Sequence, residues 1–282
     1  MKRNSTRSQP TRVIEELIEI SRELYARNNN VVLCIDVFYV CGQAFLSTID
    51  KTIKFRAAGP IDDGTDTSRY KALDAVFGCY NKADFYIKTI RCEGEFRSLM
   101  GLVQHDMDLT MDNCASGAHF PEAERNNRLI QDRSRSEFYR MPFKAVPRVM
   151  VRYLVMRAAR SHNWLPAKGG ISTHYSPYMV MHHRNLDWNK HFAHEQGSNV
   201  QANQDNKPSN NLQTHTLDCI YLNYDYESTD GGHIVMDLAT GREIRKPQVK
   251  ECVMTPLVIK RVEQLAANQG IKTFRFGSRR SV

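Results

Sequence analysis

Three acidic residues, far apart in the sequence, occupy positions from which they could share metal ions. Asp36 lies inside the apolar run V-V-L-C-I-D-V-F-Y-V, Glu93 follows another apolar run, and Glu124 lies in the first turn of a predicted helix. An unpaired carboxylate in an apolar strand is costly to bury, which favours a functional role for Asp36. Phosphoryl transfer through two metal ions needs several carboxylates at one point. We therefore expect Asp36, Glu93 and Glu124 to be catalytic and to hold two Mg²⁺ or Mn²⁺ ions.

Each of these acids also has a plainer interpretation. Asp36 could pair with a buried arginine, Glu93 could be an exposed acid in a turn, and Glu124 could complement the positive end of a helix dipole. Their combination is more specific than any one of them. One acid lies on a strand, one just after a neighbouring strand and one on a flanking helix, which is how a sheet with helices brings carboxylates together.

The positive charge of the chain is concentrated in one segment. Between Arg125 and Arg160 there are ten Lys and Arg residues and only two acids, a net +8 that equals the formal charge of the whole chain. A charge run is most often a solvated helix face. Its localisation and the isoelectric point near 9.1 favour an anionic partner, a nucleic acid or a membrane surface. The residues expected to contact nucleic acid are Arg125, Asn127, Arg128, Arg135, Lys144, Arg148 and Arg152.

Other features limit the class of protein. No segment approaches the roughly 20 consecutive apolar residues of a membrane span. Residues Met1 to Pro10 are polar and basic, unlike a secretory signal. The seven cysteines include no C-x-x-C pair, which suggests reduced, mostly buried thiols in a protein that is not secreted.

The predicted elements form an α/β scaffold that could position the three acids. Apolar runs at Val31–Val40, Ala44–Ile49 and Ile53–Ala58 have tight connections and predict an antiparallel meander. A loop from Gly59 to Thr67 separates them from alternating helices and strands, which imply a ribonuclease-H-like mixed sheet with flanking helices. The alternating elements are a helix over 70–80, a strand at Phe85–Ile90, a helix at Phe96–Val103, a strand at Leu109–Met111, a helix from Pro121 and a helix at Pro147–His162.

A small β unit is expected in the last third of the chain. The sequence predicts a polar loop at Asn199–Thr216, strands at Leu217–Tyr224 and His233–Leu238, and a hairpin leading to Glu243–Val249. A helix at Thr255–Asn268 follows. The strand expected at Lys272–Phe276 has no evident partner, as in a fragment of a longer chain. At the other end of the chain, Val13, Leu17, Ile20 and Leu24 have helical spacing.

Several of these segments carry a resemblance to a known family. Cys34–Val40, Gly94–Phe96 and the block P-E-A-E-R-N-N-R at Pro121–Arg128 resemble the integrase core of copia-type LTR-retrotransposon polyproteins. Tyr175–Tyr178 and the hairpin at Met236–Arg242 resemble segments that follow this core, where an SH3-like domain precedes the reverse transcriptase. The expected divisions are a polar segment with a short helix (1–29), the catalytic core (30–165), a connector (166–198), the SH3-like domain (199–252) and a helix with a tail (253–282).

The resemblance places the family's Asp, Asp, Glu triad on Asp36, position 93 and Glu124. It also implies DNA as partner (element ends and target), a homo-oligomer, action in the nucleus with particle assembly in the cytoplasm, and neither a membrane nor a small-molecule substrate. Position 93 departs from the family, since the family has Asp there. The additional methylene of Glu93 shifts its oxygens by more than about 1 Å, which should impair two-metal catalysis. Glu95 is an alternative ligand.

Three functions are compatible with these residues: a DNA integrase, a catalytically inactive nucleic-acid-binding remnant of the same fold, and a ribonuclease-H-type nuclease acting on RNA–DNA hybrids. The histidine-cysteine zinc module that usually precedes this core is missing before Cys34, and no Tyr-x-Asp-Asp polymerase signature occurs. His182, His183, His191 and His194 are expected mostly to contact solvent or phosphate, with zinc as a less favoured alternative. Trp164 and Trp188 are expected in the core.

Overall fold

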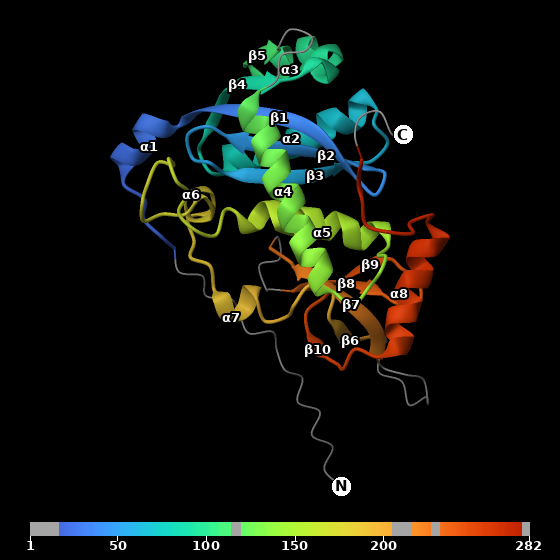
Figure 1. The fold of residues 1–282 in the computed structure, drawn as a ribbon. Coiled ribbons are helices and arrows are strands. Elements are labelled where there is room, and N and C mark those ends of the chain that lie inside the picture. Colours follow the sequence, from blue (N-terminus) through green and yellow to red (C-terminus); the bar gives the residue numbers. More distant parts are fainter. Residues whose placement is uncertain (1–16, 114–119, 205–215, 227–231, 278–282) are drawn as a thin grey trace. The chain divides into compact units, whose positions relative to one another are not determined.

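The structure is a computed structural model that describes residues 17–113, 120–204, 216–226 and 232–277. These residues form two compact units. The core unit comprises Leu17–Leu186 and Glu263–Gly277, and the β unit comprises Asp187–Val262. Figure 1 labels the helices and strands of the two units.

The core unit contains a mixed sheet whose strand order is β3-β2-β1-β4-β5. Strands β1, β2 and β3 form an antiparallel meander, and β4 and β5 continue the sheet in parallel to β1. The β1–β2 turn is tight because Cys41 and Gly42 both adopt positive φ, 49° and 73°. The predicted meander and mixed sheet are therefore present. The strands are β1 (Asn30–Val40), β2 (Gln43–Asp50), β3 (Arg56–Ile61), β4 (Tyr86–Cys92) and β5 (Thr110–Asn113).

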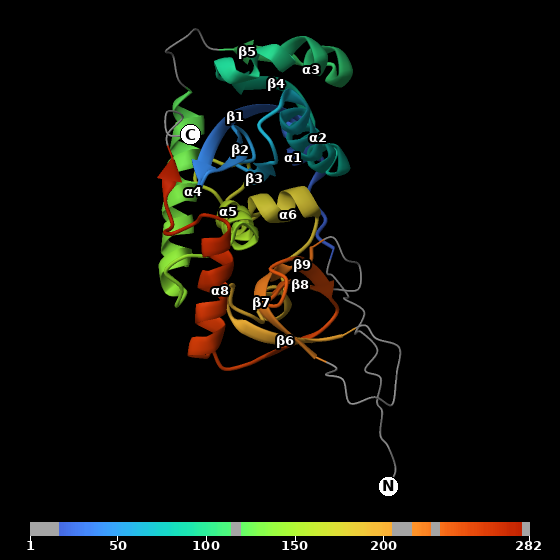
Figure 2. The same ribbon diagram turned by 90° about the vertical axis from the view of Figure 1, so that its right-hand side faces the viewer.

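Helices flank both faces of this sheet. Figures 1 and 2 agree that α4 crosses one face of the sheet and that α2 lies on the other. The predicted helix over 70–80 is confirmed as part of α2, and Phe96–Val103 divides into a 3₁₀ turn and α3. The helical elements of the core unit are α1 (Arg22–Asn28), α2 (Asp66–Lys82), η1 (Gly94–Leu99), α3 (Met100–Met107), α4 (Pro121–Arg140), α5 (Arg148–Ser161) and α6 (Pro177–His182).

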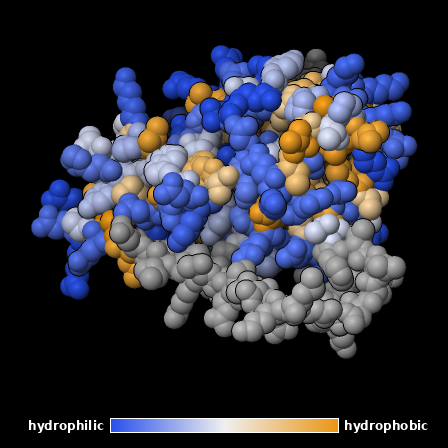
Figure 3. All heavy atoms as spheres, turned by 90° about the horizontal axis from the view of Figure 1, so that it is seen from below, coloured by the Kyte–Doolittle hydropathy of each residue, from blue (hydrophilic) through white to orange (hydrophobic). Residues whose placement is uncertain are grey.

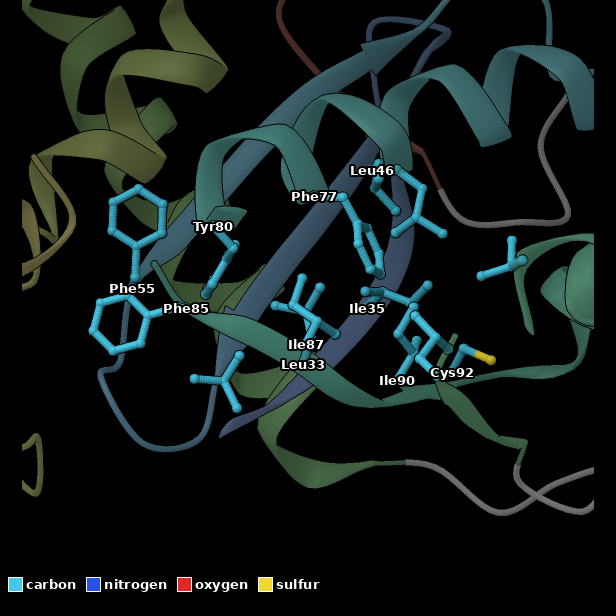
Figure 4. Packing of buried hydrophobic residues seen from close by; sticks show 14 of the residues in the cluster. Leu33, Ile35, Leu46, Phe55, Phe77, Tyr80, Phe85, Ile87, Ile90 and Cys92 are labelled. Carbon is cyan, nitrogen blue, oxygen red and sulfur yellow. The ribbon is translucent and has the colours of Figure 1, made fainter. Parts of the chain in front are cut away.

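Alternation along β1 determines which side chains meet which helix. Leu33 and Ile35 are fully buried and belong to the main hydrophobic cluster, together with Phe77 of α2. Figure 4 shows these side chains gathered between α2 and the sheet. Successive residues of a strand point to opposite faces. Cys34 accordingly groups with Ala123 of α4, and Asp36 faces the same helix.

The C-terminal part of the core unit completes the sheet. Strand β11 (Phe276–Gly277) pairs antiparallel with β1, with Val40 opposite Phe276. The prediction of an unpartnered strand at Lys272–Phe276 was therefore wrong. Long-range pairing with a strand more than 230 residues earlier leaves no local pattern in the sequence. Phe274 stacks on Phe138 of α4 with ring centroids 4.5 Å apart, which fixes this segment.

Two predicted boundaries in the first sixty residues were also wrong. The predicted N-terminal helix is non-helical around Leu17, which forms a β-bridge with Arg184, and Val13 lies outside the described residues. Helix α1 begins only after Ser21, whose hydroxyl accepts from the N–H of Leu24. Strand β3 begins at Arg56 rather than Ile53. The side chain of Asp50 accepts from the N–H groups of the turn before β3, so these groups do not take part in the hydrogen bonds between the strands.

The β unit is a five-stranded antiparallel sheet of order β10-β6-β7-β8-β9. The predicted small β unit is thus present, and its SH3-like classification stays a prediction. The predicted loop at Asn199–Thr216 was wrong for its first residues, which form β6, and residues 205–215 of it lie outside the described part. The elements are α7 (Trp188–His191), β6 (Asn199–Asn203), β7 (Thr216–Tyr224), β8 (His233–Asp237), β9 (Glu243–Lys246), β10 (Val249–Glu251) and α8 (Pro256–Asn268), which crosses the boundary between the units.

Hydrophilic residues dominate the face shown in Figure 3, with hydrophobic residues in separate groups among them.

Trp188 is 53% exposed, so its prediction as a core residue was wrong. Its ring stacks on that of Phe192, with centroids 4.7 Å apart. No helix in the described part of the chain is long and apolar enough to cross a membrane.

Candidate active site

On one side of β1, Asp36 has no paired strand among the described residues. The parallel pairing of β1 with β4 ends at Cys34, and the antiparallel pairing with β11 begins at Tyr39. Among the described residues, the intervening part of β1 is paired only with β2. Asp36 is 7% exposed. A buried carboxylate at a gap between strands needs partners from other elements, and the structure provides them.

The carboxylate of Asp36 is held by hydrogen bonds from two directions. Its Oδ1 accepts from the N–H of Val37 at 2.8 Å, and its Oδ2 accepts from Nδ2 of Asn127 at 2.6 Å. Oδ1 of Asn127 in turn accepts from the hydroxyl of Ser47. Ser47 is directly opposite Asp36 in the β1–β2 register. Bonds to an ionised acceptor are short and strong, so this network offsets much of the cost of burying the charge.

Glu124 lies one helical turn before Asn127. Helix α4 begins at Pro121, and its first turn is acidic, which suits the positive end of the helix dipole. The buried stripe of α4 includes Ala123, Asn127 and Ile130. Glu124 is exposed on the flank of that stripe. Residues three apart on a helix are neighbours, so the bond between Asn127 and Asp36 brings the turn that carries Glu124 beside β1.

Glu93 follows β4 directly and is 6% exposed. The last residue pair of the β1–β4 ladder joins Cys34 to Arg91. Asp36 and Glu93 each lie two residues beyond it, so both follow the end of this pairing. Glu95, the alternative ligand, lies in the first turn of η1 and is partly exposed.

The three carboxylates do not form one ligand set in this conformation. Among the described residues, no group of three or more His, Cys, Asp or Glu side chains could hold a metal ion. The orientations of these side chains do not fit a two-metal site. The backbone brings the strand of Asp36 and the turn of Glu124 together, and a site made of Asp36, Glu93 and Glu124 stays a prediction.

Cys34, two residues before Asp36 on the same face of β1, is an inert neighbour. Burial raises the pKa of its thiol to about 11, although Lys51 acts in the opposite direction. The thiol is therefore neutral near pH 7, and a neutral thiol is a poor metal ligand.

Some of the basic residues predicted to contact nucleic acid are exposed, and others pair with acidic residues. Arg125, Arg128, Lys144 and Arg148 are exposed, and within the described residues none of the four has an ion pair. Arg135 instead pairs with Asp132 at 2.8 Å and lies over the ring of Phe276. Arg152 is 3.9 Å from Asp62. Arg125 follows Glu124 directly and Arg128 lies about one helical turn after it, so both add positive charge to that part of α4.

Asn127 was predicted to contact phosphate, and that contact stays a prediction. Its side chain is 9% exposed and bonds to both Asp36 and Ser47. The basic character of the surrounding sequence suggested an outward orientation. The spacing of Ala123, Asn126, Asn127 and Ile130 is the signal that could have placed it on the buried stripe.

The predicted histidine contacts were wrong for His191. It is 3% exposed, its Nδ1 is 2.8 Å from the backbone oxygen of Asp187, and its ring stacks on Tyr226. His194 is 3.5 Å from Glu251 and packs against Tyr221. These rings form part of the packing of the β unit.

A surface pocket of about 370 Å³ lies in the core unit away from the three acids. It is formed by residues of α2, β4 and α3, and it contains none of the predicted site residues. Tyr70 at its wall donates to Asp106 at 3.1 Å. Its lining includes Tyr70, Asp74, Phe77, Tyr86, Lys88, Asp106 and Asp108.

No protein-family model and no curated protein matches this chain. Among solved structures, the chain is similar to the catalytic core domain of BIV integrase, with 14% sequence identity and a TM-score of 0.39. That match covers 53% of this chain and 92% of the other.

Proposed function

We propose that this chain is an integrase-like polynucleotidyl transferase of retroelement origin that acts on DNA. The observation that supports this most is the 2.6 Å hydrogen bond between Asn127 and Asp36. It ties the helical turn of Glu124 to the strand of Asp36, just where β4 ends and Glu93 follows. An in-line displacement at phosphorus through two metal ions requires carboxylates that converge on one point.

The surroundings of Glu124 favour a nucleic acid as substrate. Arg125 and Arg128 are exposed beside it on α4. They add positive charge next to the carboxylates, and phosphate neutralisation by Lys and Arg supplies most of the affinity of sequence-independent DNA binding. DNA bound along this flank of α4 would lie over the opening in the sheet at Asp36.

The proposed reaction requires divalent metal ions held by these carboxylates. The proposal requires the exposed side chain of Glu124 to turn toward Asp36 and to exchange its present contacts for metal ions. Glu93 is buried, and its longer side chain is the weakest element of the expected site. An SH3-like class for the β unit, self-association and action in the nucleus remain predictions that follow from the resemblance.

The proposal is tested by incubating the full chain with a short DNA duplex and Mg²⁺ or Mn²⁺, and measuring strand transfer and nicking. Glu124→Gln should abolish both activities and leave DNA binding intact. Glu122→Gln is the matched control, since Glu122 lies in the same turn and its carboxylate pairs with Lys51 at 2.9 Å. Activity that survives Glu124→Gln would overturn the assignment.

The same assay separates the other two functions. Cleavage of an RNA–DNA hybrid without strand transfer would identify a ribonuclease-H-type nuclease. DNA binding that depends on Arg125 and Arg128, without any cleavage, would identify a nucleic-acid-binding remnant.

A further inference from the structure

Three buried side chains from three elements form a hydrogen-bonded chain that ends on the carboxylate of Asp36. Ser47 of β2 is 1% exposed, Asn127 of α4 is 9% exposed and Asp36 of β1 is 7% exposed. The hydroxyl of Ser47 bonds to Oδ1 of Asn127, and Nδ2 of Asn127 donates to Oδ2 of Asp36 at 2.6 Å. We propose that Asn127 and Ser47 are positioning residues that fix the orientation of the Asp36 carboxylate. This inference rests on the proposed function, in which Asp36 is catalytic.

The chemistry of an amide gives this chain a direction. The oxygen of Asn127 can only accept and its nitrogen can only donate. A carboxylate can only accept, so it fixes which way the amide nitrogen points, and the hydroxyl of Ser47 then donates to the amide oxygen. If the amide were flipped, its oxygen would face an oxygen of the ionised carboxylate, and two acceptors would repel each other.

The hydroxyl of Ser47 has one hydrogen and two acceptors within reach. These are Oδ1 of Asn127 and the backbone oxygen of Asp36, the latter at 3.3 Å. The hydrogen can be shared between the amide oxygen on α4 and the backbone oxygen on β1, so Ser47 ties the two elements together.

The network restricts rotation of the carboxylate. The N–H of Val37 holds Oδ1 at 2.8 Å while Asn127 holds Oδ2. Rotation about the Cβ–Cγ bond would break both hydrogen bonds. The carboxylate is thus oriented before any substrate arrives, and preset ligands of this kind make a site effective.

The experiment compares Ser47→Ala with two matched variants. Ser47→Thr keeps a hydroxyl at the position, and Thr48→Val removes a hydroxyl from the next residue, whose Oγ1 has no hydrogen-bond partner in the described residues. Each of the three variants is compared with the unmodified chain. A substitution that only disrupts folding is recognised because the control variants share it.

Two measurements are made on each protein. The first is the Mn²⁺ concentration that gives half-maximal DNA nicking, together with the KM for DNA. The second is the hydrogen-exchange rate of the Asn127 side-chain amide, followed by NMR. Ser47→Ala should raise the Mn²⁺ midpoint by about 10- to 100-fold, the usual effect of losing a residue that orients a ligand, with the KM for DNA unchanged. It should also accelerate exchange of the Asn127 amide, and Ser47→Thr and Thr48→Val should resemble the unmodified chain.

The outcomes distinguish this inference from the proposed function. If the unmodified chain is active and Ser47→Ala changes neither the midpoint nor the exchange rate, the positioning role is overturned and the function stands. If the unmodified chain is inactive and Ser47→Ala still accelerates exchange, the network orients Asp36 as inferred and the proposed activity is wrong.

Discussion

The side-chain amide of Asn127 donates to the carboxylate of Asp36 across 2.6 Å, although 91 positions separate the two residues in the chain. This bond joins the first half of α4 to the central strand of the sheet. It explains how an Asp can be buried in an apolar strand, and it places the turn of Glu124 beside that Asp.

DNA affinity should depend on the two exposed arginines beside Glu124. Replacing Arg125 and Arg128 together by Ala should weaken binding to a short duplex and reduce the slope of log K against log salt by about 1 for each residue. Arg140→Ala is the control, because Arg140 lies at the other end of α4, 3.5 Å from Glu137. Affinities measured at several salt concentrations test this. If Arg140→Ala lowered the DNA affinity as much per removed charge as the double variant does, the affinity would depend only on the net charge of the chain.

Shortening the side chain at position 93 should improve the site. Glu93→Asp withdraws the carboxylate by one methylene, toward the length expected from the resemblance, and should increase Mn²⁺-dependent nicking of a duplex. Glu93→Gln, which keeps the length and removes the charge, should lower it. The ranking Asp above Glu above Gln is the expected result in a nicking assay. Equal rates for all three would remove position 93 from the site.

Asp50 should make the core unit less stable at neutral pH than in mild acid. Burial raises the pKa of its carboxyl group to about 6 from an ordinary 3.8, although the N–H groups of Thr52 and Ile53 act in the opposite direction. Since the folded state holds the proton more tightly, this contribution to stability is complete below pH 3.8 and is lost as pH rises through about 6.

Asp50→Asn removes this dependence and keeps an oxygen for the two N–H groups. The free energy of unfolding at pH 7 should rise by up to about 3 kcal/mol, and the difference should vanish near pH 4. Urea unfolding at both pH values measures it, with the exposed Asp74→Asn as control. A variant that is less stable than the parent at pH 7 would contradict the prediction.

The contact between Phe138 and Phe274 should help to hold the C-terminal segment against α4. Their rings are nearly parallel, 12° apart, with centroids 4.5 Å apart. A double-mutant cycle with Phe138→Ala and Phe274→Ala should give a coupling energy of about 0.5–1.5 kcal/mol in urea unfolding. Strictly additive single effects would mean that the two rings stabilise the chain independently.

Much of the scaffold could be predicted from local patterns in the sequence. The dense apolar run at Val31–Val40 predicted a strand buried on both faces, and the tight turn after it predicted the antiparallel partner. Pro121 marked the start of α4. These features are encoded by side-chain periodicity and turn residues within a few positions.

Features that depend on distant residues could not be predicted in this way. The partner of β11 is β1, and nothing near Phe276 indicates it. The inward orientation of Asn127 depends on the partner that Asp36 provides across the structure. The late start of β3 depends on the side chain of Asp50, which competes with the ladder for backbone N–H groups.

The position of a bound metal ion decides whether Asp36 and Glu124 form one site. Crystals of the full chain soaked in Mn²⁺, with anomalous scattering measured at the manganese edge, would show where the ion binds. We expect a peak about 2.1 Å from carboxylate oxygens of Asp36 and Glu124, which is lost in Glu124→Gln and kept in Glu122→Gln. A well-occupied manganese peak elsewhere, with Asp36 and Glu124 unliganded, would contradict it.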